Sequence, residues 1–119
     1  MDAQRVLSEA GAEAAVGRLA GMSPDLRGCA VLDSQGRALA AVGGDPARWA
    51  EAGAAFLAAA DAAGGEPTTH VHVATEDGEA FAVRHEGLAM VAVAERFALA
   101  SLMVFDMRAV LRGLARESA

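Results

Sequence analysis

Two short segments that contain only apolar residues, 29–32 and 88–94, most constrain how this chain can fold. A strand that is covered on both faces needs no alternation of polar and apolar side chains, so we expect these two segments to be the central strands of one sheet. The mixed segments 37–42 and 70–75 are expected at its edges. A fifth strand, 79–84, follows an acidic turn with a glycine, and short turns of this kind join antiparallel strands.

Three helices complete the expected architecture, over residues 2–21, 46–63 and 98–115. The middle helix has the plainest start, with Asp45 at the N-cap position and Pro46 at the first helical position, where its missing N–H costs nothing. The element order is then α-β-β-α-β-β-β-α. We predict an α+β fold with a five-stranded antiparallel sheet of order 2-1-5-4-3, the middle helix on one face and the other two helices on the opposite face. No repeat or linker divides residues 1–119, so a single domain is expected.

Composition and charge disfavour several classes of function. The formal net charge is −6, which argues against nucleic acid and against an anionic membrane surface as partners. Only 4% of the residues are aromatic, so few large side chains exist to line a pocket for a small substrate. One cysteine, no apolar leader and no membrane-length apolar run together predict a cytoplasmic protein.

Four features could carry chemistry, and a purely structural role is the better explanation for each of them. The 33–37 loop (DSQGR) has one glycine and precedes a strand, so a hairpin turn is favoured over a phosphate or calcium loop. An anion bound at the start of the middle helix would be repelled by the Asp45 carboxylate, so the capping role of Asp45 is favoured over an anion site. Cys29 lies in a central strand and is expected to be an inert buried thiol. The acidic turn 76–79 is expected to be solvated. We therefore expect no catalytic residues and no cofactor.

His70 and His72 lie on one face of an edge strand because side chains alternate along a strand. Two histidines can begin a metal site, but a third ligand is needed and His85 belongs to a different turn. We therefore expect no metal and place both histidines on an edge-strand surface that contributes to a dimer contact. Protonation of the histidines would then tune that contact.

The middle helix carries an unusual second face. Its bulky side suits the sheet: Trp49, Gly53, Phe56, Leu57 and Ala60. Alanines fill much of the remainder, and Arg48, Glu51 and Asp61 are its charged residues, whereas a lone surface helix should be polar there. Alanine on an ordinary surface of an alanine-rich chain is the plain alternative. We favour a second packed face against the same helix of a partner chain, formed by Ala54, Ala55, Ala58, Ala59 and Ala62.

The last helix is apolar over a wide arc. A stripe at near-heptad spacing is expected to face the sheet: Leu99, Met103, Met107, Val110 and Leu114. Leu102 and Phe105 lie outside this stripe. We expect packing between the sheet and the first helix to cover them, so no separate partner groove is required.

The ordered set of these elements resembles the Roadblock/LC7 family of small adaptor domains. The likeness covers nearly the whole chain and rests on four segments: the GCAVLDSQGRALAA hairpin, the helix after GGDPARWAEAGAAFL, the three-strand run VHVATEDGEAFAVRHEGLAMVAVAE and the final helix LASLMVFDMRAVLRGL. The resemblance implies a non-enzymatic module that forms homodimers or heterodimers through its middle helix and an edge strand. Bacterial relatives of this family often work beside small Ras-like GTPases. In its alanine content this chain resembles the members found in actinobacterial operons that pair such a domain with a GTPase and a sensor kinase.

From these observations we predict a dimeric adaptor or regulator that binds protein partners, a small GTPase among them, through the sheet edge and the middle helix. Arg37, Arg48 and Arg84 are possible contacts, and none stands out as an inserted arginine finger. The alternative is a sensing domain of PAS or GAF type. Such a domain would hold a small molecule in a cavity of a few hundred Å³ between sheet and helix.

Overall fold

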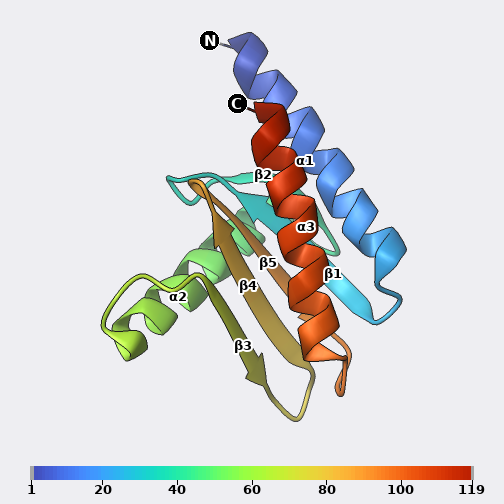
Figure 1. Cartoon of the computed structure of the whole chain (residues 1–119), viewed down its shortest axis with the longest axis vertical. Coiled ribbons are helices and arrows are strands. Elements are labelled where there is room, and N and C mark those ends of the chain that lie inside the picture. The colour runs from blue at the N-terminus through green and yellow to red at the C-terminus, as the bar shows by residue number, and fades with distance from the viewer. Residues whose placement is uncertain (1, 119) are drawn as a thin grey trace.

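The computed structural model describes the backbone of residues 2–118 and the side chains of residues 9–117. The chain forms eight elements in the expected order (Figure 1). They are α1 (Asp2–Met22), β1 (Leu26–Leu32), β2 (Ala38–Val42), α2 (Pro46–Gly64), β3 (His70–Ala74), β4 (Glu79–His85), β5 (Leu88–Ala94) and α3 (Ala100–Ser118). Among the residues described, no helix combines the length and apolarity needed to cross a membrane.

The five strands form one antiparallel sheet in the order β2-β1-β5-β4-β3, which confirms the predicted order. The two apolar strands β1 and β5 pair in the middle, where Ala30 lies opposite Val91. Both of these residues are buried, as expected for strands covered on both faces. The mixed strands β2 and β3 form the edges.

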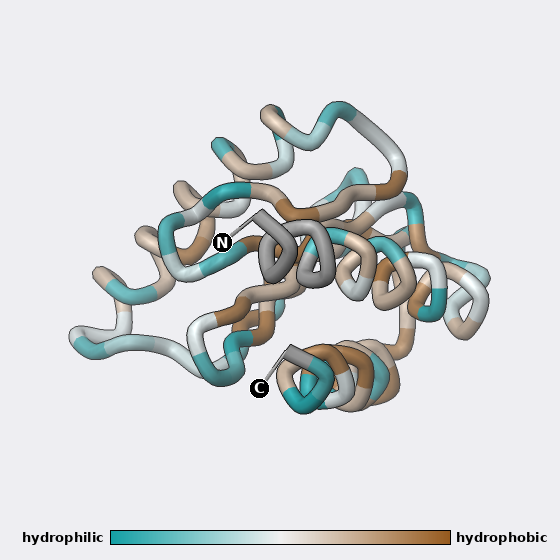
Figure 2. The backbone as a smooth tube through the Cα atoms, turned by 90° about the horizontal axis from the view of Figure 1, so that it is seen from above, coloured by the Kyte–Doolittle hydropathy of each residue, from teal (hydrophilic) through white to brown (hydrophobic). Residues whose placement is uncertain are grey.

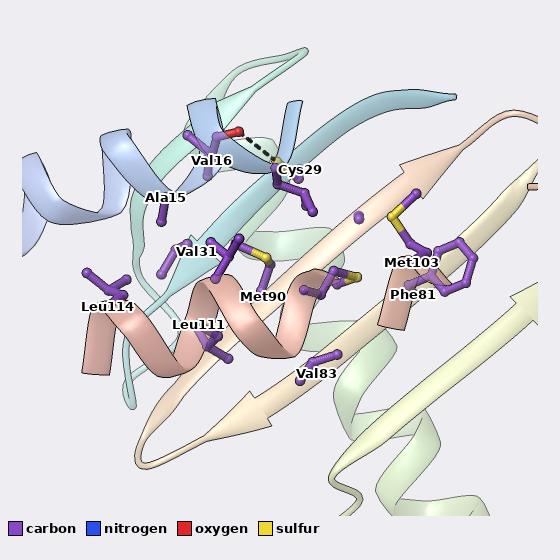
Figure 3. Close-up of a cluster of buried hydrophobic side chains, with 14 of the residues drawn as sticks. Ala15, Val16, Cys29, Val31, Phe81, Val83, Met90, Met103, Leu111 and Leu114 are labelled. Carbon is purple, nitrogen blue, oxygen red and sulfur yellow. Dashed lines mark hydrogen bonds between the residues drawn. The ribbon is translucent and has the colours of Figure 1, made fainter. Parts of the chain in front are cut away.

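Helices α1 and α3 lie side by side on one face of the sheet, and α2 covers the other face (Figure 1). Figure 2 shows the same layers from above, with α2 and α3 on opposite sides of the strands. The larger core lies between the sheet and the helix pair, where side chains of α1, α3 and the strands point toward one another (Figure 3). Phe81, Met90, Met107 and Leu111 are among its fully buried members.

A smaller core lies beneath α2 and includes Leu32, Leu57 and Val91. Gly53 allows the helix to approach closely, because a Cβ atom at this position would lie 2.9 Å from Leu32 Cδ1. The helix begins after Asp45 as predicted, but the Asp45 side chain makes no capping hydrogen bond. These contacts fix α2 firmly on the sheet.

The structure contradicts our expectation for the outer part of α3. Met103, Met107, Val110 and Leu114 are buried, but Leu99 is 65% exposed, Leu102 52% and Phe105 68%. The apolar arc of this helix is wider than the face that the sheet and α1 cover. The predicted packing of Leu102 and Phe105 between the sheet and α1 is therefore wrong.

Candidate dimer and partner interface

The outer face of α2 is almost free of polar side chains. All five alanines that we predicted on a second face are exposed: Ala54, Ala55, Ala58, Ala59 and Ala62. Over residues 52–64, every exposed position of the helix is alanine or glycine. Arg48 and Glu51 are exposed nearer its start. Because alanine side chains are short, this face permits close approach of another helix.

A hollow of about 560 Å³ lies beside this alanine face. Ala54, Leu57 and Ala58 of α2 form one wall. The turn between β1 and β2 and the turn between β4 and β5 form much of the rest. The alanine face is thus bordered by open space that a neighbouring helix could fill.

An ion pair holds the C-terminal part of α2 to the sheet. The Arg84 guanidinium donates hydrogen bonds to both carboxylate oxygens of Asp61, at 2.7 and 2.9 Å. The Thr68 backbone N–H also donates to Asp61, at 2.9 Å. The Arg84 side chain, followed by that N–H, lowers the pKa of Asp61 to about 2. Asp61 therefore anchors the helix instead of being the surface charge that we had assumed.

The outer edge of β3 is open, because this strand pairs only with β4 in the sheet. The hydrogen bonds Arg84 N–H to Thr69 O and Thr75 N–H to Gly78 O set the alternation of the ladder. By that alternation the backbone N–H and C=O groups of His70, His72 and Ala74 point away from β4. The strand contains no proline and no lysine, the residues with which proteins commonly protect an edge. It can accept another strand.

The side chains of His70 and His72 are occupied by contacts within the chain. The Nε2 atom of His72 lies 2.6 Å from Glu79 Oε1, and its ring stacks on Phe81 with centroids 4.6 Å apart. The Nδ1 atom of His70 accepts a hydrogen bond from Arg108 of α3, at 2.9 Å. Glu79 is 7% exposed, so the expectation of a solvated acidic turn is wrong for this residue. The histidines border the open edge, and their rings already have partners.

The remaining candidates behave as structural residues. Asp33 accepts hydrogen bonds from the backbone N–H groups of Gln35 and Arg37, which confirms the hairpin turn. Burial raises the pKa of the Cys29 thiol to about 11, as expected for an inert thiol. Within the part of the chain that the structure describes, no three His, Cys, Asp or Glu residues lie close enough together to hold a metal ion.

Comparison with solved structures identifies the fold. The Roadblock/LC7 domain of Streptomyces avermitilis matches with a TM-score of 0.74 at 18% identity, over 87% of this chain and 94% of that one. The gliding protein MglB of Thermus thermophilus matches with a TM-score of 0.76 at 17% identity, over 93% and 90%. A structure of MglB with a tetrameric arrangement matches with a TM-score of 0.69 at 17% identity, over 93% and 90%. The chain has the Roadblock/LC7 fold.

Sequence comparison does not reveal this likeness: no family model matches the chain, and no curated protein is similar to it at a significant level. Packing explains why. A doubly covered sheet needs apolar residues at its centre, and many combinations of alanine, valine and leucine satisfy this need. The fold can therefore persist after the residue identities have changed.

One exposed feature of this Roadblock/LC7 fold differs from the sequence-based expectation. Phe97, Leu99, Leu102 and Phe105 present large apolar side chains to solvent at the start of α3. The signal was present in the sequence, since Leu102 and Phe105 lie outside the buried stripe.

Of the three candidate arginines, Arg37 pairs with Asp33 and Arg84 pairs with Asp61. Arg48 is exposed on α2.

Proposed function

We propose that this chain is a non-enzymatic adaptor domain that forms a homodimer through α2 and the edge of β3. The observation that carries the proposal is the exposed face of α2 over residues 52–64, which holds only alanine and glycine. A monomer would normally place charged residues on such a face. The hollow beside Ala54 and Ala58 leaves room for the second helix.

In this dimer each copy uses the same surface, as two-fold symmetry requires. The alanines of the two α2 helices pack together, and the free backbone groups of β3 pair with those of the second β3 strand. The tetrameric arrangement of one MglB structure supports the idea that this fold is suited to assembly. His70 and His72 would then border the joined strands.

We further propose that the dimer binds a small Ras-like GTPase, as the family resemblance implies. Arg48 is the candidate contact on α2, because Arg37 and Arg84 are held by carboxylates of their own chain. The dimer would act by positioning the switch segments of the GTPase, not by catalysis of its own. GTPases recovered with the tagged protein should hydrolyse GTP at a rate that changes when the purified dimer is added. An unchanged rate would contradict this part of the proposal.

The dimer itself is tested by Ala58→Glu. A charge at this position would be buried without a partner in the α2 contact, so we expect the variant to be monomeric at micromolar concentration, where the wild type is dimeric. Light scattering coupled to gel filtration measures the mass. Ala20→Glu, the same change at an exposed position of α1, is the control and should stay dimeric. A monomeric wild type, or dimers of all three proteins, would refute the proposal.

The alternative, a small-molecule sensor, would have to use the hollow of about 560 Å³ beside α2. Two observations favour the adaptor. Asp61, Thr68 and Arg84, which line this hollow, already bond to one another. The close packing of Gly53 on Leu32 shows that helix and sheet are in direct contact at the middle of α2, where a sensing domain would need a cavity.

A further inference from the structure

Residues 97–105, which run from just before α3 into its first turns, carry an exposed apolar patch on the face of the sheet opposite to α2. Its four residues, Phe97, Leu99, Leu102 and Phe105, are 81%, 65%, 52% and 68% exposed. We call them the α3 patch. The other large apolar residues of comparable exposure among the described residues, Met22, Val42 and Val73, come from three separate elements. A cluster of large apolar side chains in one segment is typical of a binding surface.

The backbone at the end of the patch is held in an unfavourable conformation. Phe97 has a φ of +69°, a region that residues with large side chains seldom adopt. The Arg96 guanidinium carbon lies 4.6 Å from the centre of the Phe97 ring. This strained turn keeps an aromatic ring in solvent, with a cation on its face.

Positive charge continues along the exposed side of α3. Arg108, Arg112 and Arg116 follow one another at intervals of four residues, so they lie along one side of the helix. Asp106 is on the buried side, at 7% exposure, and Glu117 lies near Gly11 of α1. In a chain of net charge −6, this is a locally basic surface that adjoins an apolar one.

A hollow of about 680 Å³ lies between α3 and β3, directly beside the patch. Phe105 belongs to both features. Val104, Arg108 and Arg112 line the hollow from α3, and His70 and His72 line it from β3. The surface therefore combines an apolar recess with cations at its rim.

We propose that this groove binds an acidic amphipathic helix of a partner protein. A large apolar side chain of that helix enters the hollow beside Phe105, others cover Leu102 and Leu99, and its carboxylates face Arg108 and Arg112. The charge pattern selects an acidic partner, because the rest of this acidic chain repels such a segment and this face attracts it. The recess favours a protruding side chain over a lipid surface. The site lies across the sheet from α2, and the residues proposed to contact the partner helix belong to α3 and the residues just before it, not to the α2 and β3 contact of the proposed dimer.

The test uses two labelled helical peptides of about 18 residues with the same leucine and phenylalanine anchors, one with glutamate and one with lysine on the flanking positions. Fluorescence anisotropy measures binding to the full chain. We expect the glutamate peptide to bind at least about tenfold more tightly than the lysine peptide, with a preference that weakens as salt is added. In the double variant Arg108→Glu/Arg112→Glu this preference should reverse. Arg18→Glu, at an exposed position of α1, should leave it unchanged.

A second pair of variants tests the apolar contribution. Leu102→Ser/Phe105→Ser should weaken the glutamate peptide about tenfold or more, whereas Met22→Ser, at a separate exposed apolar position, should not. Thermal unfolding checks that all variants fold, which is expected because these side chains are exposed. Ala58→Glu should bind the peptide as the wild type does, so failure of the dimer proposal leaves this one testable.

Three outcomes would overturn the inference. The first is equal binding of the two peptides, or no binding of the glutamate peptide to the wild type. The second is binding to vesicles of anionic phospholipid that Leu102→Ser/Phe105→Ser abolishes, with no binding of the peptides, which would make the patch a membrane contact. The third is a particle mass that the same double variant halves, which would show that a second copy of this chain covers the patch.

Discussion

At the scale of single residues, Gly28 shows how closely the elements around the alanine-bearing helix are packed. A Cβ atom at Gly28 would lie 2.6 Å from the carbonyl oxygen of Val42 and 2.8 Å from Cζ2 of Trp49. Gly28 therefore lets the start of β1, the end of β2 and the first turn of α2 meet at one point. The Trp49 ring packs over this contact, and this packing positions α2 on the sheet.

Two glycine-to-alanine substitutions should have opposite effects. Gly28→Ala places a methyl group against a backbone carbonyl that cannot move freely, and we expect it to destabilise the fold by about 1–3 kcal/mol. Gly17→Ala lies on an open side of α1, with nothing within 4 Å of the new atom. It should stabilise the protein by about 0.5–1 kcal/mol, because alanine is the better helix former. Urea denaturation measures both, and a neutral Gly28→Ala would contradict the packing argument.

At the scale of elements, the strand order was predictable and the cover of α3 was not. The apolar runs of β1 and β5 identify central strands by themselves, because a doubly covered strand has no polar face. An apolar helix face does not reveal what covers it, so the position of Leu102 and Phe105 outside the buried stripe did not by itself predict that they are exposed. The roles of Asp61 and Glu79 were not predicted because their partners lie on other elements: Arg84 of β4 is 23 residues from Asp61 of α2, and Glu79 of β4 pairs with His72 of β3.

The candidate site was predictable only as a surface. The exposure of Ala58 and its neighbours follows from helical periodicity, and the positions of His70 and His72 on β3 follow from strand alternation. That the rings of these histidines contact Phe81, Glu79 and Arg108 could not be deduced. Such contacts depend on how strands pair and on where α3 crosses them.

The edge of β3 allows a test that separates strand pairing from helix packing. In Ala74→Pro the lost N–H points away from β4, so we expect the monomer fold to be retained. The dimer should weaken severalfold or more, because the second strand loses a partner and meets the proline ring. Analytical ultracentrifugation measures the dissociation constant. In Val73→Pro the lost N–H faces β4, so this variant should lose stability instead. An Ala74→Pro variant that folds and dimerises like the wild type would exclude the edge from the contact.

At the scale of the whole molecule, three ion pairs connect neighbouring segments of the fold. Arg84–Asp61 joins the sheet to α2, Arg27–Glu95 joins the start of β1 to the end of β5, and Arg37–Asp33 closes the first hairpin. The pKa of each carboxyl group is lowered. Hydrogen bonds from the arginine partners are the main cause for Asp61 and Glu95. For Asp33, burial raises the pKa, but hydrogen bonds from the Arg37 and Gln35 backbone and from the Arg37 side chain outweigh it.

These shifts predict how the whole molecule responds to acid. A carboxyl group with a lowered folded pKa stabilises the native state above its unfolded pKa, and this contribution disappears as the pH falls through the folded pKa. For Asp61 the unfolded pKa is about 3.9, and the folded value is about 2. The free energy of unfolding, measured in urea, should therefore decline as the pH falls from about 4 toward 2.

The variant Asp61→Asn assigns a part of this decline to one ion pair. It should be less stable than the wild type at neutral pH, and the difference should shrink as the pH falls toward 2, because the unfolded carboxyl group is then protonated and the folded one begins to be. Asp45→Asn is the matched control, because the Asp45 side chain makes no capping bond, and its curve should run parallel to that of the wild type. A stability difference between Asp61→Asn and the wild type that stays constant over this range would mean that the contact acts through shape alone. Since Asp61 also orients the alanine face, its loss at neutral pH should weaken the proposed dimer together with the fold.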